Sequence, residues 1–256
     1  MKQIGDRILY FEEIDSTNEE VKRQAEAGAE HGLLVVADAQ TSGKGRRGRC
    51  WESPAGNNVF MSLLLRPSFG IEKASMITLV MALSVLQAIR ETTELEAFIK
   101  WPNDIVINGK KVVGILTELM TEPDGSFYLV CGVGINVNQR EFPEEISATA
   151  TSLLLEKMNE ASEFDRKSLT NKVIDCFAKN YQVFCKKETI EEMLDEYNTF
   201  LVNRNASVRV LDPKGEYEGV ALGINPEGEL LVQCADGDIR NVYAGEVSVR
   251  GIYGYV

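Results

Sequence analysis

The segment 40–51 (QTSGKGRRGRCW) holds the densest positive charge in the chain. Lys44, Arg46, Arg47 and Arg49 fall within six positions, and no acidic residue interrupts them. The chain as a whole is acidic, with a formal net charge of −12 at pH 7. Arginine forks match the oxygens of phosphate and carboxylate groups. A solvated surface loop would carry the same charges, so the segment by itself leaves an anion site and a solvated loop as alternatives.

Three glycines, Gly43, Gly45 and Gly48, separate these cations and satisfy the G-x-G-x-x-G pattern. Glycine lets backbone N–H groups come close to an anion. A dinucleotide-binding turn must also open a helix and place an acid about twenty residues further on. Here the turn-like, proline-broken segment 51–58 (WESPAGNN) follows, and no acid lies at that spacing. The context therefore excludes a dinucleotide fold, and no P-loop pattern is present.

Composition predicts a globular protein of one large domain, or one large and one small domain. The chain has 256 residues, of which 44% are hydrophobic and 26% charged. The N-terminus has no signal-peptide pattern and no apolar run approaches about 18 residues, so neither secretion nor a membrane span is expected. Five scattered cysteines predict free thiols in a reducing cytoplasm. The acidity argues against duplex DNA as a partner, and His31, the only histidine, is interpreted as structural.

Periodicity predicts the elements of a mixed α+β domain. The chain is expected to begin with a helix, with Ser16 as N-cap, Glu19 completing a capping box and Gly28 ending it. Further helices are expected at 74–92, around 169–184 and at 190–200. The expected strands are 33–37, 59–65, 97–101, 105–107, 112–120 and 127–131, with hairpin turns at 108–109 and 124–125.

After about residue 203 the pattern changes to short alternating segments joined by tight turns. Strands are expected at 207–211, 216–224, 229–234 and 239–243, without helices, which is typical of a small β-barrel. The predicted organisation is a domain at 1–202, with a mixed β-sheet flanked by helices, followed by a small C-terminal β-barrel at 203–256.

Four further motifs could carry chemistry. Segment 15–18 (DSTN) lies at a helix N-terminus, where free N–H groups favour anions. Segment 100–104 (KWPND) surrounds a rigid turn with a cation, an amide and a carboxylate. Segment 108–111 (NGKK) places two lysines at the start of a strand, and 132–138 (GVGINVN) ends a strand with small residues and amides. Each motif alone is more often a cap, a hairpin tip or a turn.

Taken together and in this order, DSTN, QTSGKGRRGRCW, KWPNDIVINGKKVVGIL and GVGINVN resemble the catalytic core of biotin–protein ligases. The resemblance runs from about residue 14 to 138, and the segment after 203 is similar to that family's C-terminal domain. The loop departs from the family's usual GRGRRGR at Lys44, which keeps the charge but loses the arginine fork.

The resemblance implies a two-step reaction with ATP and biotin as substrates, accompanied by Mg²⁺. Biotin's carboxylate attacks the α-phosphate of ATP, giving biotinyl-5′-AMP and pyrophosphate. A lysine of a biotin carboxyl carrier protein then takes the biotinyl group and releases AMP. It implies no dedicated metal site, because substrate oxygens and water supply most ligands of Mg²⁺.

The resemblance also implies the roles of individual residues. Lys111 and Arg46 stabilise the reacting anions, and Asp104 orients the incoming amine or accepts its proton. The residues expected to bind biotin are Ser16, Thr17, Asn18, Gln40, Gly43, Gly45, Arg46, Lys111 and Gly114. The residues expected to bind ATP are Arg46, Arg49, Trp51, Asn103, Lys111 and Asn136. The loop 42–51 is expected to order over the adenylate.

Some family members carry an N-terminal DNA-binding module. This chain begins about a dozen residues before DSTN, so a ligase without DNA-binding regulation is expected, located in the cytoplasm and either a monomer or a homodimer. Two other functions stay open: a lipoate–protein ligase, which shares fold and chemistry, and a non-catalytic sensor of biotin or nucleotide.

Overall fold

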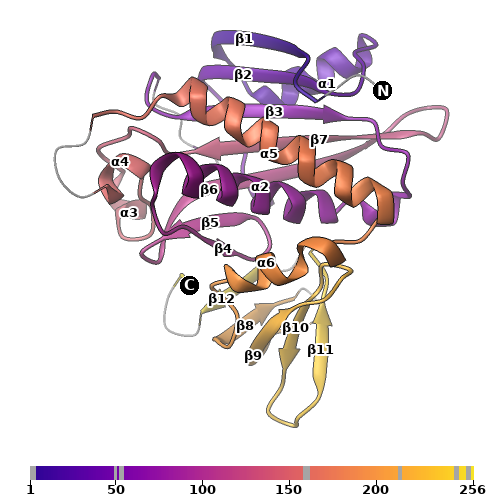
Figure 1. The fold of residues 1–256 in the computed structure, drawn as a ribbon, viewed down its shortest axis with the longest axis vertical. Helices are drawn as coiled ribbons and strands as arrows, with labels where there is room; N and C mark the ends of the chain where they lie inside the picture. Colours follow the sequence, from indigo (N-terminus) through magenta and orange to yellow (C-terminus); the bar gives the residue numbers. More distant parts are fainter. Residues whose placement is uncertain are drawn as a thin grey trace.

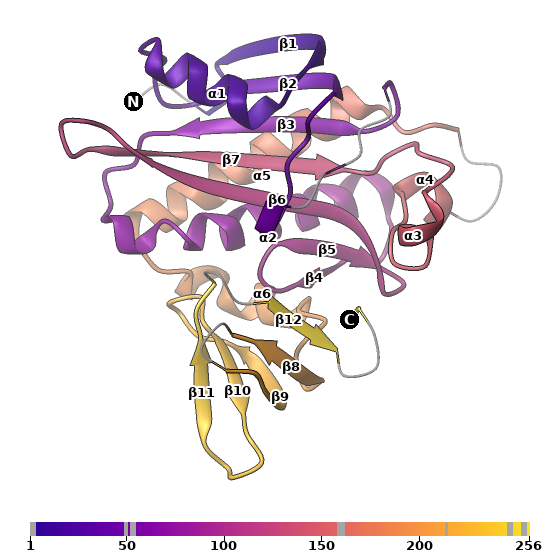
Figure 2. The same cartoon turned by 180° about the vertical axis from the view of Figure 1, so that it is seen from behind.

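The computed structural model describes residues 4–48, 51, 55–157, 162–212, 215–244, 248–251 and 255–256. They form a seven-stranded mixed sheet with helices on both faces and, beside it, a five-stranded antiparallel sheet (Figures 1 and 2). The elements of the larger unit are β1 (Arg7–Ile14), α1 (Thr17–Glu26), β2 (Leu33–Gln40), the 3-10 helix η1 (Arg46–Gly48), β3 (Val59–Leu65), η2 (Ile71–Lys73), α2 (Met76–Thr93), β4 (Phe98–Lys100), β5 (Asp104–Ile107), β6 (Lys110–Thr121), β7 (Phe127–Ile135), α3 (Glu144–Ser147), α4 (Leu153–Glu156), α5 (Arg166–Lys187), η3 (Glu191–Met193) and α6 (Leu194–Thr199). The second sheet contains β8 (Ser207–Leu211), β9 (Tyr217–Ile224), β10 (Leu230–Gln233), β11 (Ile239–Val242) and β12 (Ser248–Gly251).

The strands of the larger sheet follow the order β1-β2-β3-β7-β6-β5-β4. Only β1 and β2 are parallel, and the other neighbours are antiparallel. β5 and β6 meet in a two-residue turn in which Asn108 and Gly109 have φ angles of 49° and 75°. Asparagine and glycine tolerate this left-handed geometry, and the turn sets the register of the hairpin.

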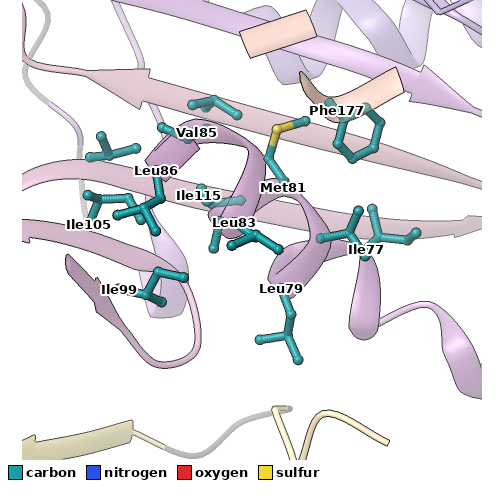
Figure 3. Close-up of a cluster of buried hydrophobic side chains, with 14 of the residues drawn as sticks. Ile77, Leu79, Met81, Leu83, Val85, Leu86, Ile99, Ile105, Ile115 and Phe177 are labelled. Atoms are coloured by element: carbon teal, nitrogen blue, oxygen red, sulfur yellow. The ribbon is translucent and has the colours of Figure 1, made fainter. Parts of the chain in front are cut away.

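Helices α2 and α5 cover one face of the larger sheet and build the main core with it (Figure 1). In Figure 3, Ile77, Met81 and Val85 of α2 lie among side chains from the sheet and Phe177 of α5, while Leu79 points toward the second sheet. α2 is buried nearly all round, which explains its weak division into apolar and polar sides. Side chains of both sheets therefore pack against α2 in one core.

The apolar character of α2 also bears on the membrane question. The segment Ile71–Thr93 is long and apolar enough to cross a membrane by length and composition. This differs from the expectation that no apolar run reaches such a length. Because 67% of its most apolar window is buried inside the protein, packing accounts for its composition.

The opposite face of the sheet is covered only in part. α1 packs there through Val21 and Ala25 against Leu33 of β2, Leu64 of β3 and Val130 of β7. Figure 2 shows that α1 lies over one side of this face, and that the chain following β2 crosses in front of β7 and β6. The area between α1 and that crossing segment is where polar side chains gather.

The first element differs from the sequence-based prediction. Strand β1 precedes α1, so the chain does not begin with a helix. Ser16 is at the N-cap position, but its side chain makes no capping hydrogen bond, and Glu19 instead accepts from Lys22 and Lys44. The predicted capping box is therefore wrong, because Glu19 has stronger partners in Lys22 of its own helix and in Lys44 of the segment 40–51, called the basic loop below.

The second sheet also corrects a prediction. Its order is β11-β10-β9-β8-β12, and the two edge strands do not pair with each other in the described part of the chain. The predicted barrel is thus an antiparallel sheet without closure, and β12 was absent from the predicted strands. The predicted boundary between the two domains, near residue 203, stays a prediction.

Two smaller predictions concern single side chains. Four of the five cysteines are free, and Cys50 lies outside the described residues. His31 is structural: its Nδ1 accepts a hydrogen bond from the backbone N–H of Arg66 at 3.0 Å, and burial lowers the pKa of its imidazole.

Candidate active site

Glycines form the floor of the site on the partly covered face. Gly114 of β6 pairs with Gly134 of β7, and Gly132 lies two residues earlier on the same face. The Trp51 ring rests on the first pair: a Cβ added to Gly114 would lie 2.6 Å from Cζ3 of Trp51, and one added to Gly134 would lie 2.8 Å from Cε2. A Cβ on Gly132 would collide with Oδ1 of Asn18. Glycine is therefore required wherever another side chain lies flat on the sheet.

A chain of hydrogen bonds lines the inner end of the site, at the start of α1. Oε1 of Gln40 accepts from the backbone N–H of Thr17 at 2.8 Å and from its hydroxyl at 3.0 Å. The Ser62 hydroxyl lies 2.7 Å from Oγ1 of Thr17 and 2.5 Å from Oδ1 of Asn18. Nδ2 of Asn18 donates to Glu118 at 2.7 Å. The buried side chains are thereby held in fixed orientations.

Two cations of the basic loop are tied to different elements. Lys44 pairs with Glu19 of α1 at 2.7 Å, while Nη1 of Arg46 donates to Oδ1 of Asn103 at 2.7 Å. Asn103 in turn donates to the backbone oxygen of Ile115 at 3.2 Å. Lys44 therefore anchors the loop on the α1 side, and Arg46 is directed toward the KWPND turn.

Lys111 and Asp104 form an ion pair at 2.6 Å beside this turn. Asp104 is 8% exposed, and burial raises the pKa of its carboxyl. The charges of Lys111 and Lys100 and the hydrogen bonds from Lys111 and Tyr255 outweigh burial, so the pKa lies below its ordinary value. Burial lowers the pKa of Lys100 to about 8, while the Asp104 carboxylate opposes that shift.

Two cavities meet at these side chains. The smaller has a volume of about 50 Å³ and is lined by the α1 residues, the glycine floor and the basic loop. The larger, of about 540 Å³, reaches β12 and the chain's end, and includes Lys100, Asp104, Asn136, Arg250 and Tyr255. The residues that line both cavities are Gly45, Arg46, Trp51, Asn103 and Lys111.

Charge in the larger cavity is opposite to that of the whole chain. Among the described residues, its lining includes the cations Arg46, Lys100, Lys111 and Arg250 and the carboxylates Asp104 and Glu145. Enclosed cations of this kind attract anions more strongly than the same charges would in water. The cavity is therefore suited to a polyanion, whereas the small cavity offers hydroxyl and amide groups to a neutral polar ligand.

Comparisons with known proteins place the chain in a family. The model of the biotin/lipoate A/B protein ligase family matches residues 10–136, and that of the biotin protein ligase C-terminal domain matches residues 205–250. The bifunctional ligase/repressor BirA of Bacillus subtilis is 39% identical over 249 residues, covering 96% of this chain and 75% of the relative. The chain belongs to the biotin protein ligase family.

Other members agree over nearly the whole chain. A biotin--[acetyl-CoA-carboxylase] ligase of Mycobacterium tuberculosis is 30% identical over 240 residues, covering 91% of this chain and 85% of the relative. The structure of the Aquifex aeolicus biotin protein ligase in complex with biotin and ATP has a TM-score of 0.85 and 34% identity. It covers 96% of this chain and 99% of that one.

The fold of this ligase brings together most of the residues predicted for the site. The small cavity is lined by Ser16, Thr17, Asn18, Gln40, Gly45, Arg46, Lys111 and Gly114. Asn103, Asp104 and Asn136 line the large one. Gly43 is buried and its carbonyl accepts from the backbone N–H of Trp51 at 2.9 Å, but Gly43 lines neither cavity. Arg49 lies outside the described residues.

Trp51, which was expected to bind ATP, lines both cavities. Its ring lies on Gly114 and Gly134 with Lys111 Nζ 5.3 Å from its centroid, so it covers Gly114, which was expected to bind biotin. The reason is geometric: the ring is flat, and the two paired glycines offer it a surface free of side chains.

Sequence reasoning missed five residues around the site. These are Ser62, Lys100, Glu118, Arg250 and Tyr255. Ser62 had a signal, because it is the only polar residue in the apolar strand VFMSLLL. Lys100 stood in a motif but received no role. Arg250 and Tyr255 had no local signal, since only folding brings the chain's end to this cavity.

Proposed function

We propose that this protein activates biotin with ATP, forming biotinyl-5′-AMP and pyrophosphate, and then transfers biotin to a lysine of a carrier protein. One observation carries the proposal: Arg46 and Lys111 line both cavities. A carboxylate from the small cavity and a phosphate from the large one would meet between these two cations. Fixed cations at the place where two anions react lower the barrier without having to reorganise.

The small cavity is suited to the ring system of biotin. The ureido group presents one C=O and two N–H groups, and the hydroxyls and amides around Thr17, Asn18 and Gln40 offer partners of both kinds. A volume of about 50 Å³ is too small, since ligand pockets measure roughly 300–1,000 Å³. The Trp51 ring must therefore leave the glycine floor when biotin enters.

The large cavity is suited to ATP, whose phosphates would lie among Arg46, Lys100, Lys111 and Arg250. Asn136 lines this cavity with its Nδ2 bonded to the backbone oxygen of Thr151 at 3.0 Å. Within the described residues no three His, Cys, Asp or Glu side chains gather to hold a metal. We therefore treat Mg²⁺ as part of the substrate, entering as its complex with ATP and held by phosphate oxygens and water.

Asp104 was expected to orient the incoming amine or to accept its proton, and the geometry supports a different role, the positioning of Lys111. Its oxygens already accept from Lys111, Asn103 and Tyr255, and its pKa lies below the ordinary value. A carboxylate so well satisfied is a weak base. Asp104 would position Lys111 between the cavities instead of taking the proton of the incoming amine.

The carrier would be the biotin carboxyl carrier protein or domain of a biotin-dependent carboxylase, in the cytoplasm. Two further points stay predictions: that the protein has no regulatory role through DNA binding, and that it is a monomer or a homodimer. The loop 42–51 would close over the adenylate, with Lys44 held on Glu19 as the anchor.

The test is ATP–pyrophosphate exchange with purified protein and Mg²⁺, comparing biotin, lipoate and no acid. Exchange with biotin alone is expected. Exchange with lipoate would move the assignment to the lipoate ligases, which share the matched family model. Binding of biotin without any exchange would support the sensor alternative and contradict the proposal.

A further inference from the structure

The end of the chain reaches the KWPND turn. The Tyr255 hydroxyl donates a hydrogen bond to Oδ2 of Asp104, and the ring of Tyr255 lies 4.4 Å from Nζ of Lys100. Strand β12, just before it, provides the backbone oxygen of Val249, which accepts from the same Nζ at 3.2 Å. Lys100 and Asp104, the first and last residues of the motif, are thus both contacted by Tyr255, and Lys100 also by Val249.

The two oxygens of Asp104 have different partners. Oδ1 accepts from Nζ of Lys111 at 2.6 Å and from Nδ2 of Asn103 at 3.1 Å. For Oδ2, the hydrogen bond found among the described residues comes from Tyr255. A carboxylate that is 8% exposed needs donors on both oxygens, because water is largely excluded.

We propose that Tyr255 is a positioning residue of the reaction: by holding Oδ2 of Asp104, it fixes the carboxylate so that Oδ1 holds Lys111 at the junction of the two cavities. This inference rests on the proposed ligase function. Tyr255 acts through Asp104 and Lys111, and the C-terminal sheet thereby contributes to the adenylation site through the chain that follows β12.

The cationic surroundings explain why the hydroxyl matters. Asp104 faces Lys111 of β6 and Lys100 of β4, and the charges of Arg46 and Arg250 also reach Lys100 from the basic loop and from β12. The ammonium of Lys111 has three N–H donors, so it can contact the substrate anions while one donor stays on Oδ1 of Asp104. The Tyr255 hydroxyl keeps the buried carboxylate hydrogen-bonded and ionised, so that Oδ1 continues to hold Lys111.

The position of Val256, next to Tyr255, depends on Gly251. A Cβ added to Gly251 would collide with the backbone oxygen of Val256. The backbone of Val256 therefore lies beside Gly251 at a distance that no side chain permits. Gly251→Ala should displace Tyr255 from Asp104 while leaving the Tyr255 side chain chemically intact.

The experiment uses Tyr255→Phe in the full-length protein, which removes the hydroxyl and keeps the ring over Lys100. Tyr10→Phe is the matched control, since Tyr10 is 58% exposed on β1. Two quantities are measured: the titration of the Asp104 carboxyl by ¹³C NMR, with Asp104→Asn identifying the resonance, and the pH profile of biotin-dependent ATP–pyrophosphate exchange.

In Tyr255→Phe we expect the Asp104 carboxyl to titrate at higher pH than in the wild type. We expect exchange to fall by about tenfold, as for loss of a hydrogen bond to a charged group, with its acid limb moved to higher pH. The melting temperature should also fall, because a buried carboxylate oxygen loses its donor. Gly251→Ala should show the same shift, and Tyr10→Phe should match the wild type.

An unchanged Asp104 titration in Tyr255→Phe would overturn the proposal. So would a loss of exchange that is equal at every pH, because it would indicate a merely structural role. If the wild type itself shows no exchange, the ligase function fails, but the carboxyl titration still tests the contact between Tyr255 and Asp104 independently.

Discussion

At the scale of residues, the site consists of charged groups that are already held in place. Lys111 is paired with Asp104, and Arg46 with Asn103. Both cations therefore face the junction of the cavities before any substrate is bound. Their electrostatic effect requires little rearrangement, which is the condition under which such groups contribute most to catalysis.

Lys111→Ala should reduce biotin-dependent ATP–pyrophosphate exchange by about 10²–10³-fold, the usual effect of removing one group that stabilises developing charge. The neighbouring Lys110→Ala is the control, because Lys110 lines neither cavity. Lys110→Ala should unfold at nearly the wild-type urea concentration, whereas Lys111→Ala should still fold but unfold at a lower one, because the buried Asp104 carboxylate loses its ion pair. Near-normal exchange by Lys111→Ala would refute its assigned role.

ATP binding should weaken as pH rises from 7 to 9. The pKa of Lys100 is lowered to about 8, so Lys100 is a cation below that pH and neutral above it. Losing this charge should raise the Kd of a non-hydrolysable ATP analogue by roughly tenfold, measured by calorimetry. Lys100→Arg should flatten the dependence, since arginine stays charged. The same pH dependence in that variant would exclude Lys100 as its source.

Biotin should change the fluorescence of Trp51, because the ring must leave Gly114 and Gly134 to admit the substrate. The other tryptophan, Trp101, is 1% exposed and should contribute a constant background. The measurement is emission during titration with biotin, in the wild type and in Trp51→Phe. No change at saturating biotin would mean that the ring stays in place.

At the scale of elements, the two helix starts show how similar sequence signals lead to different contacts. Asp165 caps α5 by accepting from the backbone N–H groups of Lys167 and Ser168 at 2.9 and 3.2 Å. Ser16 occupies the same position on α1 but makes no such bond, and its side chain lines the small cavity instead. The N-terminus of α5 thus stabilises the fold, whereas the N-terminus of α1 lines the small cavity.

Asp165→Ala should therefore destabilise the protein by about 0.5–2 kcal/mol, the usual cost of losing an N-cap. Asp175→Ala, an exposed change within the same helix, should cost little, because Asp175 caps nothing. Ser16→Ala should leave stability nearly unchanged and weaken biotin binding. Urea denaturation measures the first two effects, and a cost for Asp165→Ala no greater than for Asp175→Ala would contradict the argument.

At the scale of the molecule, the KWPND turn joins the two sheets. The backbone N–H of Trp101 donates to Oδ1 of Asn203 at 2.9 Å, and its indole N–H donates to the backbone oxygen of Gly228 at 3.2 Å. Lys100 reaches Val249 of β12. The turn that carries Asp104 is therefore fixed from the side of the second sheet as well as its own.

Asn203→Ala should destabilise the protein by about 1–3 kcal/mol, because it leaves the buried N–H of Trp101 without its acceptor. It should also raise the KM for ATP, since the turn borders the large cavity. Gln233→Ala, an exposed change on β10, is the control. A normal KM for ATP in a destabilised Asn203→Ala variant would show that the hydrogen bond between Trp101 and Asn203 supports folding alone.

Sequence reasoning was most successful where the determinants are local. The expected strand at 59–65 and the main helices were confirmed, because apolar spacing reports directly which side of an element is buried. The hairpin at Asn108 and Gly109 was also confirmed, since few residues accept its backbone angles. It was less successful at β1 and β12, edge strands that depend on pairing with distant partners for their existence.

By itself, the sequence determined the chemistry of this protein: the basic glycine loop, the KWPND turn and the lysine pair identify a family and its reaction. Only the tertiary structure decided how these groups are arranged. In the folded protein the Trp51 ring lies on paired glycines, Glu19 forms an ion pair with Lys44, and Tyr255 from the chain's end contacts Asp104. Residue types and local spacing specify which contacts are chemically available. Which of them form depends on segments far apart in the chain meeting in one packed structure, where a buried charge must find a partner.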